Sequence, residues 1–336
     1  MKRSLLAAAA ATALFATATG TAFATTDATS QRLAGTTRYG TAAAVATQPG
    51  YQIGGTSVVV TSGESYPDAL AASTLASPVV LTASTGLSSD AKAALQSLKA
   101  SRPNAIVVGG TASLPESIVA EVRALGFQVR RIAGTDRYDT AALVAQEHTP
   151  VVVNTKKTAI VVTGREFTDA LAAAPAGLPV LLTEAKSVPA PTSKALDTLG
   201  IQQVIVVGGT DSVADTTLQT LGNSNSRTVS RVAGPNAAAT AAAVAEWEVF
   251  VLGWTPSTVI LSSSLLFPDG LSGGALGAAL KAPVLMAGFG LPSETTAFID
   301  AHSKTVNKVI ALGGTRSVDD ASVTQAIAAA KNTAND

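Results

Sequence analysis

One eight-residue motif recurs along this chain at intervals of about 100 residues. Residues 32–39 (RLAGTTRY) and 131–138 (RIAGTDRY) are near-copies, whereas residues 231–238 (RVAGPNAA) keep only the first half of the motif. A unit that recurs at this interval indicates one supersecondary module built three times. We therefore divide the chain into repeats at residues 25–130, 131–230 and 231–330, followed by a polar tail at 331–336.

Each repeat contains the same series of short apolar segments separated by turn residues. In the first repeat, strands are expected at residues 57–61 (SVVVT), 78–82 (PVVLT) and 105–108 (AIVV), with helices between them. A fourth strand, at 127–132, leads into the second copy of the motif. Strands that are apolar throughout are covered on both faces, which is typical of a parallel sheet between helices. The predicted fold class is therefore α/β.

The third repeat has no segment after its last helix to match residues 127–132 of the first repeat or 228–232 of the second. The matching segment that remains is residues 31–35, near the N-terminus. A missing strand would leave an open sheet edge. We therefore predict that this segment pairs beside residues 309–312 and closes the three lobes into a ring.

The N-terminus has the pattern of a secretory signal peptide. Lys2 and Arg3 precede a short apolar run, and residues 22–24 (AFA) match a cleavage site. A membrane-spanning helix needs about 20 apolar residues, so removal of residues 1–24 is expected rather than anchoring. The mature protein is predicted to be secreted, with no membrane segment.

Composition excludes several classes of function. Loss of Lys2 and Arg3 takes two of the 23 basic residues, leaving 21 against 23 acidic residues and a net charge of −2. Duplex nucleic-acid binders usually carry a basic surplus, so nucleic acid is not a predicted partner. The chain has no cysteine, and its two histidines, His148 and His302, lie in different repeats. The absence of cysteine excludes thiolate nucleophiles and cysteine-bound metals, and two separated histidines offer little for a histidine-based catalytic centre. We therefore predict no metal site.

The ordered motifs resemble the cell-wall-binding type 2 repeat. The resemblance rests on R-[LIV]-A-G-x-x-R-Y, x-x-D-A-L-A-A, P-V-[VL]-L-T and V-V-G-G-T, which recur in this order over residues 32–330, with departures in the third copy. It implies three Rossmann-like lobes around a pseudo-threefold axis. It also implies non-covalent attachment of a secreted protein to anionic wall polymers, as in clostridial surface-layer proteins. In that family a separate functional domain usually accompanies the repeats, whereas here the repeats occupy the chain.

The second half of the repeated motif supplies the best candidate ligand contacts, which are Arg38, Tyr39, Arg137 and Tyr138. Arginine matches phosphate or carboxylate bidentately, and tyrosine adds a donor and an apolar face. The alternative is an intramolecular pair, such as Arg38 with Asp68. In the third repeat Ala237 and Ala238 replace the pair, so only two of three sites would be complete if it contacts ligand.

Two further sets are candidates for anion binding. The leading arginines of the motif are either a shared interface or a shared ligand contact: Arg32, Arg131 and Arg231. Glycine-rich loops follow a strand in each repeat, where backbone amides can hold an anion: Gly109, Gly110, Thr111, Gly208, Gly209, Thr210, Gly313, Gly314 and Thr315. The alternative is that the turn needs glycine for conformational reasons alone. No dinucleotide or P-loop motif is present, so no nucleotide or other cofactor is predicted.

No catalytic residues are predicted. The recurring aspartates Asp68, Asp169 and Asp269 each lie at a helix start, where a carboxylate stabilises the helix, and no pair of acids recurs at close spacing in the three repeats. No G-x-S-x-G motif marks a serine nucleophile.

The sequence therefore predicts a secreted, non-catalytic cell-wall protein that binds an anionic wall polymer as a monomer with internal pseudo-threefold symmetry. Two alternatives stay open. The first is a small-solute-binding or interaction scaffold in the envelope, which tight small-molecule affinity without wall retention would favour. The second is an envelope hydrolase, which release of reducing ends or amino groups from wall material would favour.

Overall fold

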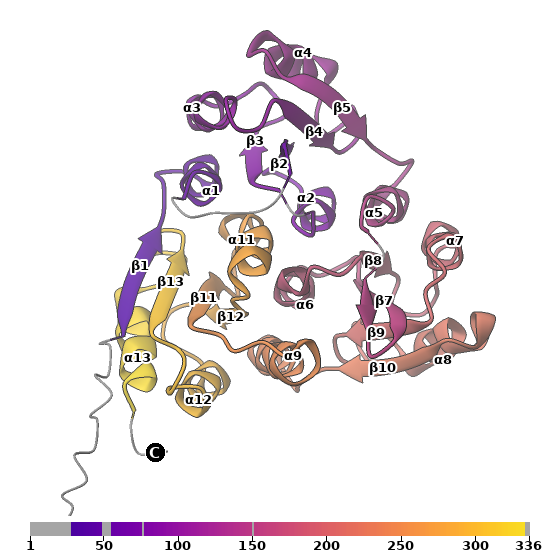
Figure 1. The fold of residues 1–336 in the computed structure, drawn as a ribbon, viewed down its shortest axis with the longest axis vertical. Helices are drawn as coiled ribbons and strands as arrows, with labels where there is room; N and C mark the ends of the chain where they lie inside the picture. The colour runs from indigo at the N-terminus through magenta and orange to yellow at the C-terminus, as the bar shows by residue number, and fades with distance from the viewer. Residues whose placement is uncertain (1–27, 49–54, 76, 150, 333–336) are drawn as a thin grey trace, which may run out of the picture.

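The computed structural model describes residues 28–48, 55–75, 77–149 and 151–332. The predicted signal peptide lies outside these residues. The described chain forms three α/β lobes arranged as a ring, as predicted (Figure 1). Each lobe is built on a sheet whose four main strands are all parallel.

The three sheets share one strand order, in which the first strand of the repeat lies inside, between the second and third. The first lobe has β3 (Val79–Thr82), β2 (Ser57–Ser62), β4 (Asn104–Val108) and β5 (Gln128–Ile132). The second has β8 (Val180–Thr183), β7 (Lys156–Thr163), β9 (Gln203–Val207) and β10 (Thr228–Val232), and β6 (Val152–Val153) adds a short antiparallel pairing to β7.

The third lobe takes its last strand from the beginning of the chain. Its sheet runs β12 (Val284–Ala287), β11 (Thr258–Ser263), β13 (Lys308–Leu312) and β1 (Thr29–Leu33). The strand β1 pairs in parallel with β13 over its whole length, with Arg32 opposite Ala311. The predicted closure of the ring is therefore confirmed.

Helices cover both faces of each sheet. Those of the first lobe are α1 (Arg38–Ala46), α2 (Tyr66–Ala72), α3 (Ser89–Leu98) and α4 (Glu116–Ala124). Those of the second are α5 (Arg137–Ala145), α6 (Thr168–Ala173), α7 (Ala190–Thr198) and α8 (Asp215–Asn223), with 3-10 turns at Ala174–Ala176 and Ser224–Ser226. Those of the third are α9 (Ala237–Leu252), α10 (Phe267–Gly270), α11 (Gly273–Leu280), α12 (Ser293–Ala301) and α13 (Asp320–Ala330).

The apolar core is divided between a shared centre and three outer parts. The central cluster includes Leu70, Leu171 and Leu271, which occupy the same position in successive repeats and are at most 1% exposed. The helices α2, α6 and α11 lie at the middle of the ring (Figure 1). Each lobe has a second cluster on its outer side. The central cluster takes residues from all three lobes. Because burial of apolar surface is the main source of stability, the stability of each lobe depends on the other two.

Each turn from one lobe to the next is built from the repeated motif. The residue before the helix caps it in every copy, because Thr37, Asp136 and Asn236 accept from the backbone N–H three residues ahead. The helices therefore begin at residues 38, 137 and 237. The repeat boundaries at residues 130 and 230 cut through β5 and β10, so the sequence repeat and the structural lobe are offset.

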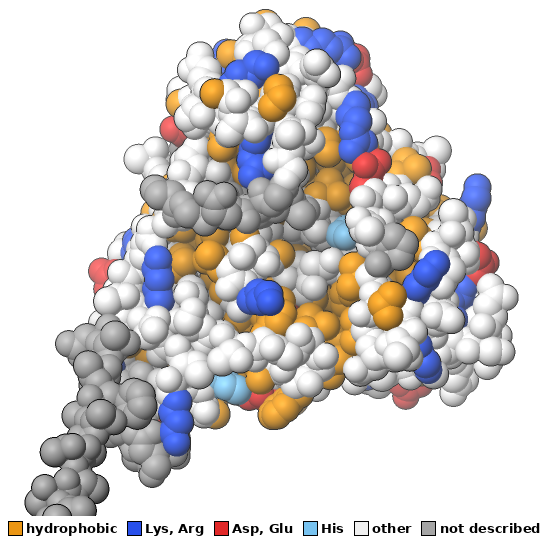
Figure 2. All heavy atoms as spheres, viewed as in Figure 1, with side chains coloured by type: hydrophobic (Ala, Val, Ile, Leu, Met, Phe, Trp, Pro, Cys, Tyr) orange, Lys and Arg blue, Asp and Glu red, His pale blue; other side chains and the backbone are white. Residues whose placement is uncertain are grey.

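No helix in the described part of the chain combines the length and apolar character that crossing a membrane requires. On the face shown in Figure 2, apolar side chains gather around the centre of the ring, and charged side chains are scattered over the lobes.

Candidate ligand-binding junctions

Motif residues from successive repeats meet where two lobes join. We name these places the 1–2, 2–3 and 3–1 junctions, after the lobes that they join. Each contains the aspartate at the start of an inner helix, the glycine-rich loop of the same lobe, and the first turn of the helix that begins the next repeat. At the 1–2 junction these are Asp68, the loop after β4, and the N-terminal turn of α5. All lie at the carboxyl ends of the parallel strands, where ligands of open α/β sheets bind.

The leading arginines hold the glycine-rich loops in place. The Nη1 atoms of Arg32, Arg131 and Arg231 donate to the carbonyls of Gly313, Gly109 and Gly208, at 2.9, 2.5 and 2.6 Å. In each copy the guanidinium also donates to the carbonyl five residues further along the chain, that of Val318, Leu114 or Val213. It then pairs with an exposed carboxylate of the following helix, which is Asp320, Glu116 or Asp215. These contacts give the leading arginines an architectural role in all three lobes.

The glycine-rich loops have a conformational reason for their first glycine. Gly109, Gly208 and Gly313 have φ angles of 126°, 119° and 88°, which side chains rarely adopt. An added Cβ would also lie within 3.0 Å of an oxygen of the aspartate below it, at 3.0, 2.6 and 2.2 Å respectively. The second glycine of each loop faces open space: an added Cβ at Gly110, Gly209 or Gly314 would meet no heavy atom within 4 Å. The threonine that follows is exposed in all three loops. Binding of an anion by the loop amides stays a prediction.

The recurring aspartates lie beneath these loops. Burial raises the pKa of Asp68, opposed by a hydrogen bond from Thr140 and by the charge of Arg137. Burial also raises the pKa of Asp169, where Ser212 donates to the carboxylate and Glu166 adds repulsion. The pair of Arg38 with Asp68 suggested from the sequence is wrong. The partners of Asp68 come instead from the next repeat.

Arg38 and Arg137 each donate a hydrogen bond from the guanidinium to a backbone carbonyl of their own lobe. Their Nη1 atoms donate to the carbonyls of Gly63 and Gly164, at 2.7 and 2.6 Å. Each guanidinium also lies over an aromatic ring of the preceding lobe in ring order. Arg38 is 5.9 Å from the centroid of Phe267, and Arg137 is 6.0 Å from that of Tyr66. Neither forms an ion pair with a carboxylate in the described chain, so each presents a positive charge at its junction.

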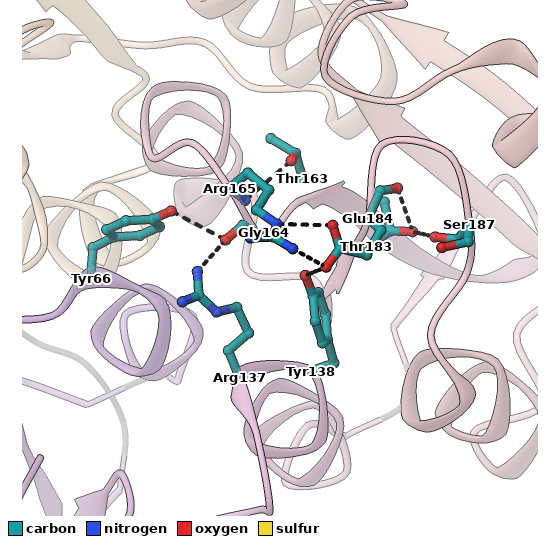
Figure 3. Close-up of polar contacts among 9 residues, drawn as sticks. All are labelled: Tyr66, Arg137, Tyr138, Thr163, Gly164, Arg165, Thr183, Glu184 and Ser187. Carbon is teal, nitrogen blue, oxygen red and sulfur yellow. Dashed lines mark hydrogen bonds and ion pairs between the residues drawn. The ribbon is translucent and has the colours of Figure 1, made fainter. Parts of the chain in front are cut away.

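Tyr138 belongs to a polar network in the second lobe (Figure 3). Its hydroxyl donates to Glu184 Oε1 at 2.5 Å, and Arg165 pairs with the same carboxylate at 2.7 Å. Burial and the contact with Glu184 raise the pKa of Tyr138 to about 12. Burial likewise raises the pKa of Tyr39, with the charge of Glu64 adding to it. Both tyrosines stay protonated at neutral pH, and Tyr138 is engaged within the protein.

An aromatic cluster at the centre of the ring was not predicted from the sequence. Tyr66, Phe167 and Phe267 come from the three lobes, and their ring centroids are 5.7–6.2 Å apart. The Tyr66 hydroxyl donates to the Gly164 carbonyl at 3.1 Å, which also accepts from Arg137 (Figure 3). The available signal was the aromatic residue that recurs two positions before each aspartate. The cluster carries two of the candidate arginines, because Arg38 and Arg137 stack on two of its rings.

The 3–1 junction encloses a cavity of about 510 Å³. The first turn of α1 supplies Arg38 and its neighbours from Gly35 onward, and the third lobe supplies Asp269 and the loop from Gly314 to Ser317. This volume falls within the range of small-ligand sites in proteins. The cavity thus joins residues that are nearly 300 positions apart in the chain.

The third copy of the motif is altered in a coordinated way. Ala237 and Ala238 stand in place of arginine and tyrosine, and Ser264 stands where the other lobes have Gly63 and Gly164. A Cβ at Gly63 would be 2.8 Å from Tyr39 Cε1, and one at Gly164 would be 2.8 Å from Tyr138 Cε1. Without the tyrosine, the third lobe has room for a side chain there. Its leading arginine, Arg231, still holds the glycine-rich loop. The arginine that holds the loop is therefore independent of the arginine–tyrosine pair, which this lobe lacks.

No group of three or more histidine, cysteine, aspartate or glutamate side chains that could hold a metal ion occurs among the residues that the structure describes.

Comparison with known proteins agrees with this architecture. The model of the cell wall binding domain 2 (CWB2) family matches residues 32–119, 131–218 and 231–324. N-acetylmuramoyl-L-alanine amidase LytC of Bacillus subtilis (strain 168) is 32% identical over 296 residues, which make up 86% of this chain and 56% of the amidase. The amidase enhancer of the same bacterium is 32% identical over 196 residues, 56% of this chain and 25% of that protein.

Two solved structures share the fold. Cwp6 from Clostridium difficile superposes with a TM-score of 0.76 at 25% identity, over 91% of this chain and 48% of that chain. Cwp8 from the same organism superposes with a TM-score of 0.76 at 22% identity, over 90% of this chain and 51% of that chain, and this match concerns the fold alone. The chain therefore spans about half of each of these structures, and about half or less of the curated relatives. With three matches in series, one in each sequence repeat, the chain belongs to the cell wall binding domain 2 family.

Proposed function

We propose that this protein is a secreted, non-catalytic wall-binding protein that attaches non-covalently to an anionic glycopolymer. Membership of a cell wall binding family supports attachment to the wall. The anionic character of the ligand is supported by one observation above others. Arg38 and Arg137 form no ion pair with a carboxylate of the described chain, although the charge of Arg137 acts on Asp68 and Glu184; Arg38 is exposed and Arg137 is half-buried.

The chemistry of these arginines fits a phosphate or carboxylate better than a neutral sugar. Each guanidinium is held by a carbonyl on one side and an aromatic ring on the other, so its remaining N–H groups are pre-oriented. A planar donor pair of this kind matches two oxygens of an anion. Hydroxyl groups of Thr36, Thr37 and Thr315 line the same cavity as Arg38 and can bind sugar hydroxyls.

We infer no enzymatic activity for this chain. The amidase among its relatives is nearly twice as long as the matched region, so its activity is not extended to the repeats. We also propose that the protein acts as a monomer, because the three lobes already close on one another through a shared core.

Binding to purified Gram-positive cell walls tests the proposal. Walls are compared before and after hydrofluoric acid extraction, which removes phosphodiester-linked polymers. Wild-type protein should be retained by intact walls, and retention should fall with rising salt. Arg38→Gln should weaken retention by about tenfold, the effect of losing one charge-assisted contact. Arg137→Gln should weaken retention by a smaller factor, because the charge of Arg137 already acts on Asp68 and Glu184. The matched control is Arg123→Gln, an exposed arginine in the last turn of α4. Equal retention on extracted and intact walls would contradict binding to a phosphate polymer, and cleavage of wall bonds would contradict the non-catalytic assignment.

A further inference from the structure

The three junctions are built from equivalent residues but carry different charges. We infer that the 3–1 junction is the principal anion site and that it takes a sugar bearing an anionic group. This inference rests on the proposed function and names the site and the ligand class. It follows from three sequence positions compared across the repeats.

The first position is the residue after the Gly-Gly-Thr loop. It is Arg316 at the 3–1 junction, Ala112 at the 1–2 junction and Asp211 at the 2–3 junction, and all three are exposed. Arg316 lines the cavity of the 3–1 junction and forms no hydrogen bond or ion pair with any other described residue. Its charge is therefore free to meet a ligand.

The second position is the first residue of the helix that begins the next repeat. It is Arg38 at the 3–1 junction, Arg137 at the 1–2 junction and Ala237 at the 2–3 junction. At these two positions together, the 3–1 junction thus has two arginines, the 1–2 junction one, and the 2–3 junction none, in addition to the leading arginine that supports each loop. Two guanidinium groups that face one cavity strengthen anion binding, because their potentials add at the ligand.

The third position lies in the turn before the inner helix. It is Leu266 at the 3–1 junction, Ser65 at the 1–2 junction and Glu166 at the 2–3 junction. Glu166 lies close enough to Asp169 to raise the pKa of that carboxyl. Together with Asp211, it makes the 2–3 junction acidic and therefore repulsive to an anionic polymer.

The acidic groups near the 3–1 junction leave its arginines unpaired. Asp269 accepts a hydrogen bond from Ser317 Oγ at 2.5 Å beneath the loop. Asp320 is paired with Arg32. Asp90 accepts from Thr37 at 3.3 Å and lines a separate groove between α1 and α3. Neither Arg38 nor Arg316 forms an ion pair with any of them in the described chain.

The cavity also has an apolar wall, which points to a sugar rather than a bare anion. Leu266 and Pro268 line it together with polar residues at and just before the start of α1. Aliphatic C–H faces of a pyranose ring can pack against such side chains while its hydroxyls bind Thr36 or Thr315. The shared chemistry of the ligand is therefore a sugar with a phosphate or a carboxylate group.

The experiment introduces a glutamate at three exposed positions: Arg316→Glu at the 3–1 junction, Ala112→Glu at the equivalent position of the 1–2 junction, and Arg123→Glu on α4 as a control. None of these side chains is buried, so all three variants should fold as the wild-type protein does. Equal melting temperatures in thermal unfolding would verify this. Binding is measured to a glycosylated polyglycerol phosphate, to a glucuronate-containing polymer and to neutral dextran. Arg316→Glu should weaken binding to one charged polymer by about tenfold or more, and the other two variants by less than about twofold.

The two charged polymers separate the possible sources of the anion. A loss confined to polyglycerol phosphate assigns a phosphate, and a loss confined to the glucuronate polymer assigns a carboxylate. Equal losses for Arg316→Glu and Ala112→Glu, or no loss for Arg316→Glu in a protein that still binds walls, would overturn the single-junction inference and leave the proposed function standing. Failure of the wild-type protein to bind either charged polymer or intact walls would overturn both.

Discussion

The guanidinium of Arg137 lies over the ring of Tyr66 from the neighbouring lobe, and both side chains donate to the carbonyl of Gly164. One backbone oxygen therefore joins the first lobe to the second. The same contact fixes Tyr66 within the central aromatic cluster.

Tyr66→Phe removes the hydroxyl donor and keeps the ring. Because phenylalanine occupies the equivalent positions in the other lobes, the cluster should survive, and the free energy of unfolding should fall by about 1 kcal/mol, the usual net value of one hydrogen bond. Tyr66→Ala removes the ring as well and should cost about 3–5 kcal/mol. Urea unfolding measures both. Equal losses would show that the ring contributes nothing beyond the hydroxyl.

Gly63→Ala places a methyl group 2.8 Å from the ring of Tyr39. The clash should lower the free energy of unfolding by about 1–3 kcal/mol, as overpacking does elsewhere. In the background of Tyr39→Ala the same change should cost much less, giving a positive coupling in a double-mutant cycle. Ser264→Ala, at the equivalent position of the third lobe, is the matched control and should change stability by at most about 0.5 kcal/mol. An additive cycle would show that the ring and the glycine do not constrain one another.

Glu248 is a carboxyl inside the third lobe that should make stability depend on pH. It is fully buried in α9, both carboxylate oxygens lack a partner among the described residues, and burial raises its pKa well above 4.5. Burial makes the folded state favour the protonated form of Glu248. The contribution of Glu248 to the free energy of unfolding is therefore complete below pH 4.5, and it is lost as pH rises toward the raised pKa. Glu248→Gln should remove this slope and raise the melting temperature at neutral pH.

His148 should give the opposite dependence on pH. It contacts Thr74 Oγ1 of the first lobe at 3.0 Å, and burial lowers its pKa to about 4, partly offset by the charge of Glu147 and a backbone hydrogen bond to Gly177. The folded state favours the neutral ring, so this contribution is complete above pH 6.5 and is lost as pH falls toward 4. The loss should be on the order of 2–3 kcal/mol. Comparing His148→Gln with wild type between pH 7 and pH 4 isolates the effect, and parallel curves for the two proteins would exclude it.

The sequence was sufficient to predict the sheets and the closing strand. Residues 31–35 could be assigned to the third lobe because every other copy of the segment already followed a completed lobe, and only the third lobe lacked one. This logic needs only the order of segments along the chain. The structure agrees with it, and β1 lies beside β13.

The order of segments along the chain could not predict which side chains of different repeats contact one another. Asp68 was paired with Arg38 because both lie in one repeat, whereas its partners, Thr140 and Arg137, come from the next. The central aromatic cluster was missed for a similar reason. Spacing in sequence shows which residues are equivalent, but which equivalent residues converge depends on how the lobes are arranged in space. The cavity at the 3–1 junction is lined by residues of the first and third repeats, so it too could not be predicted from spacing in the sequence.

The pairing of β1 with β13 also orders the assembly of the molecule in time. A ribosome releases Thr29–Leu33 long before Lys308–Leu312 exists, so β1 must wait for the partner strand with which it pairs. The first two sheets can be completed as the chain grows, but the third must wait for the final repeat. A chain cut short after the second repeat would keep an orphan strand and have no 3–1 junction. Anion binding at that junction would therefore report that translation had reached the last lobe.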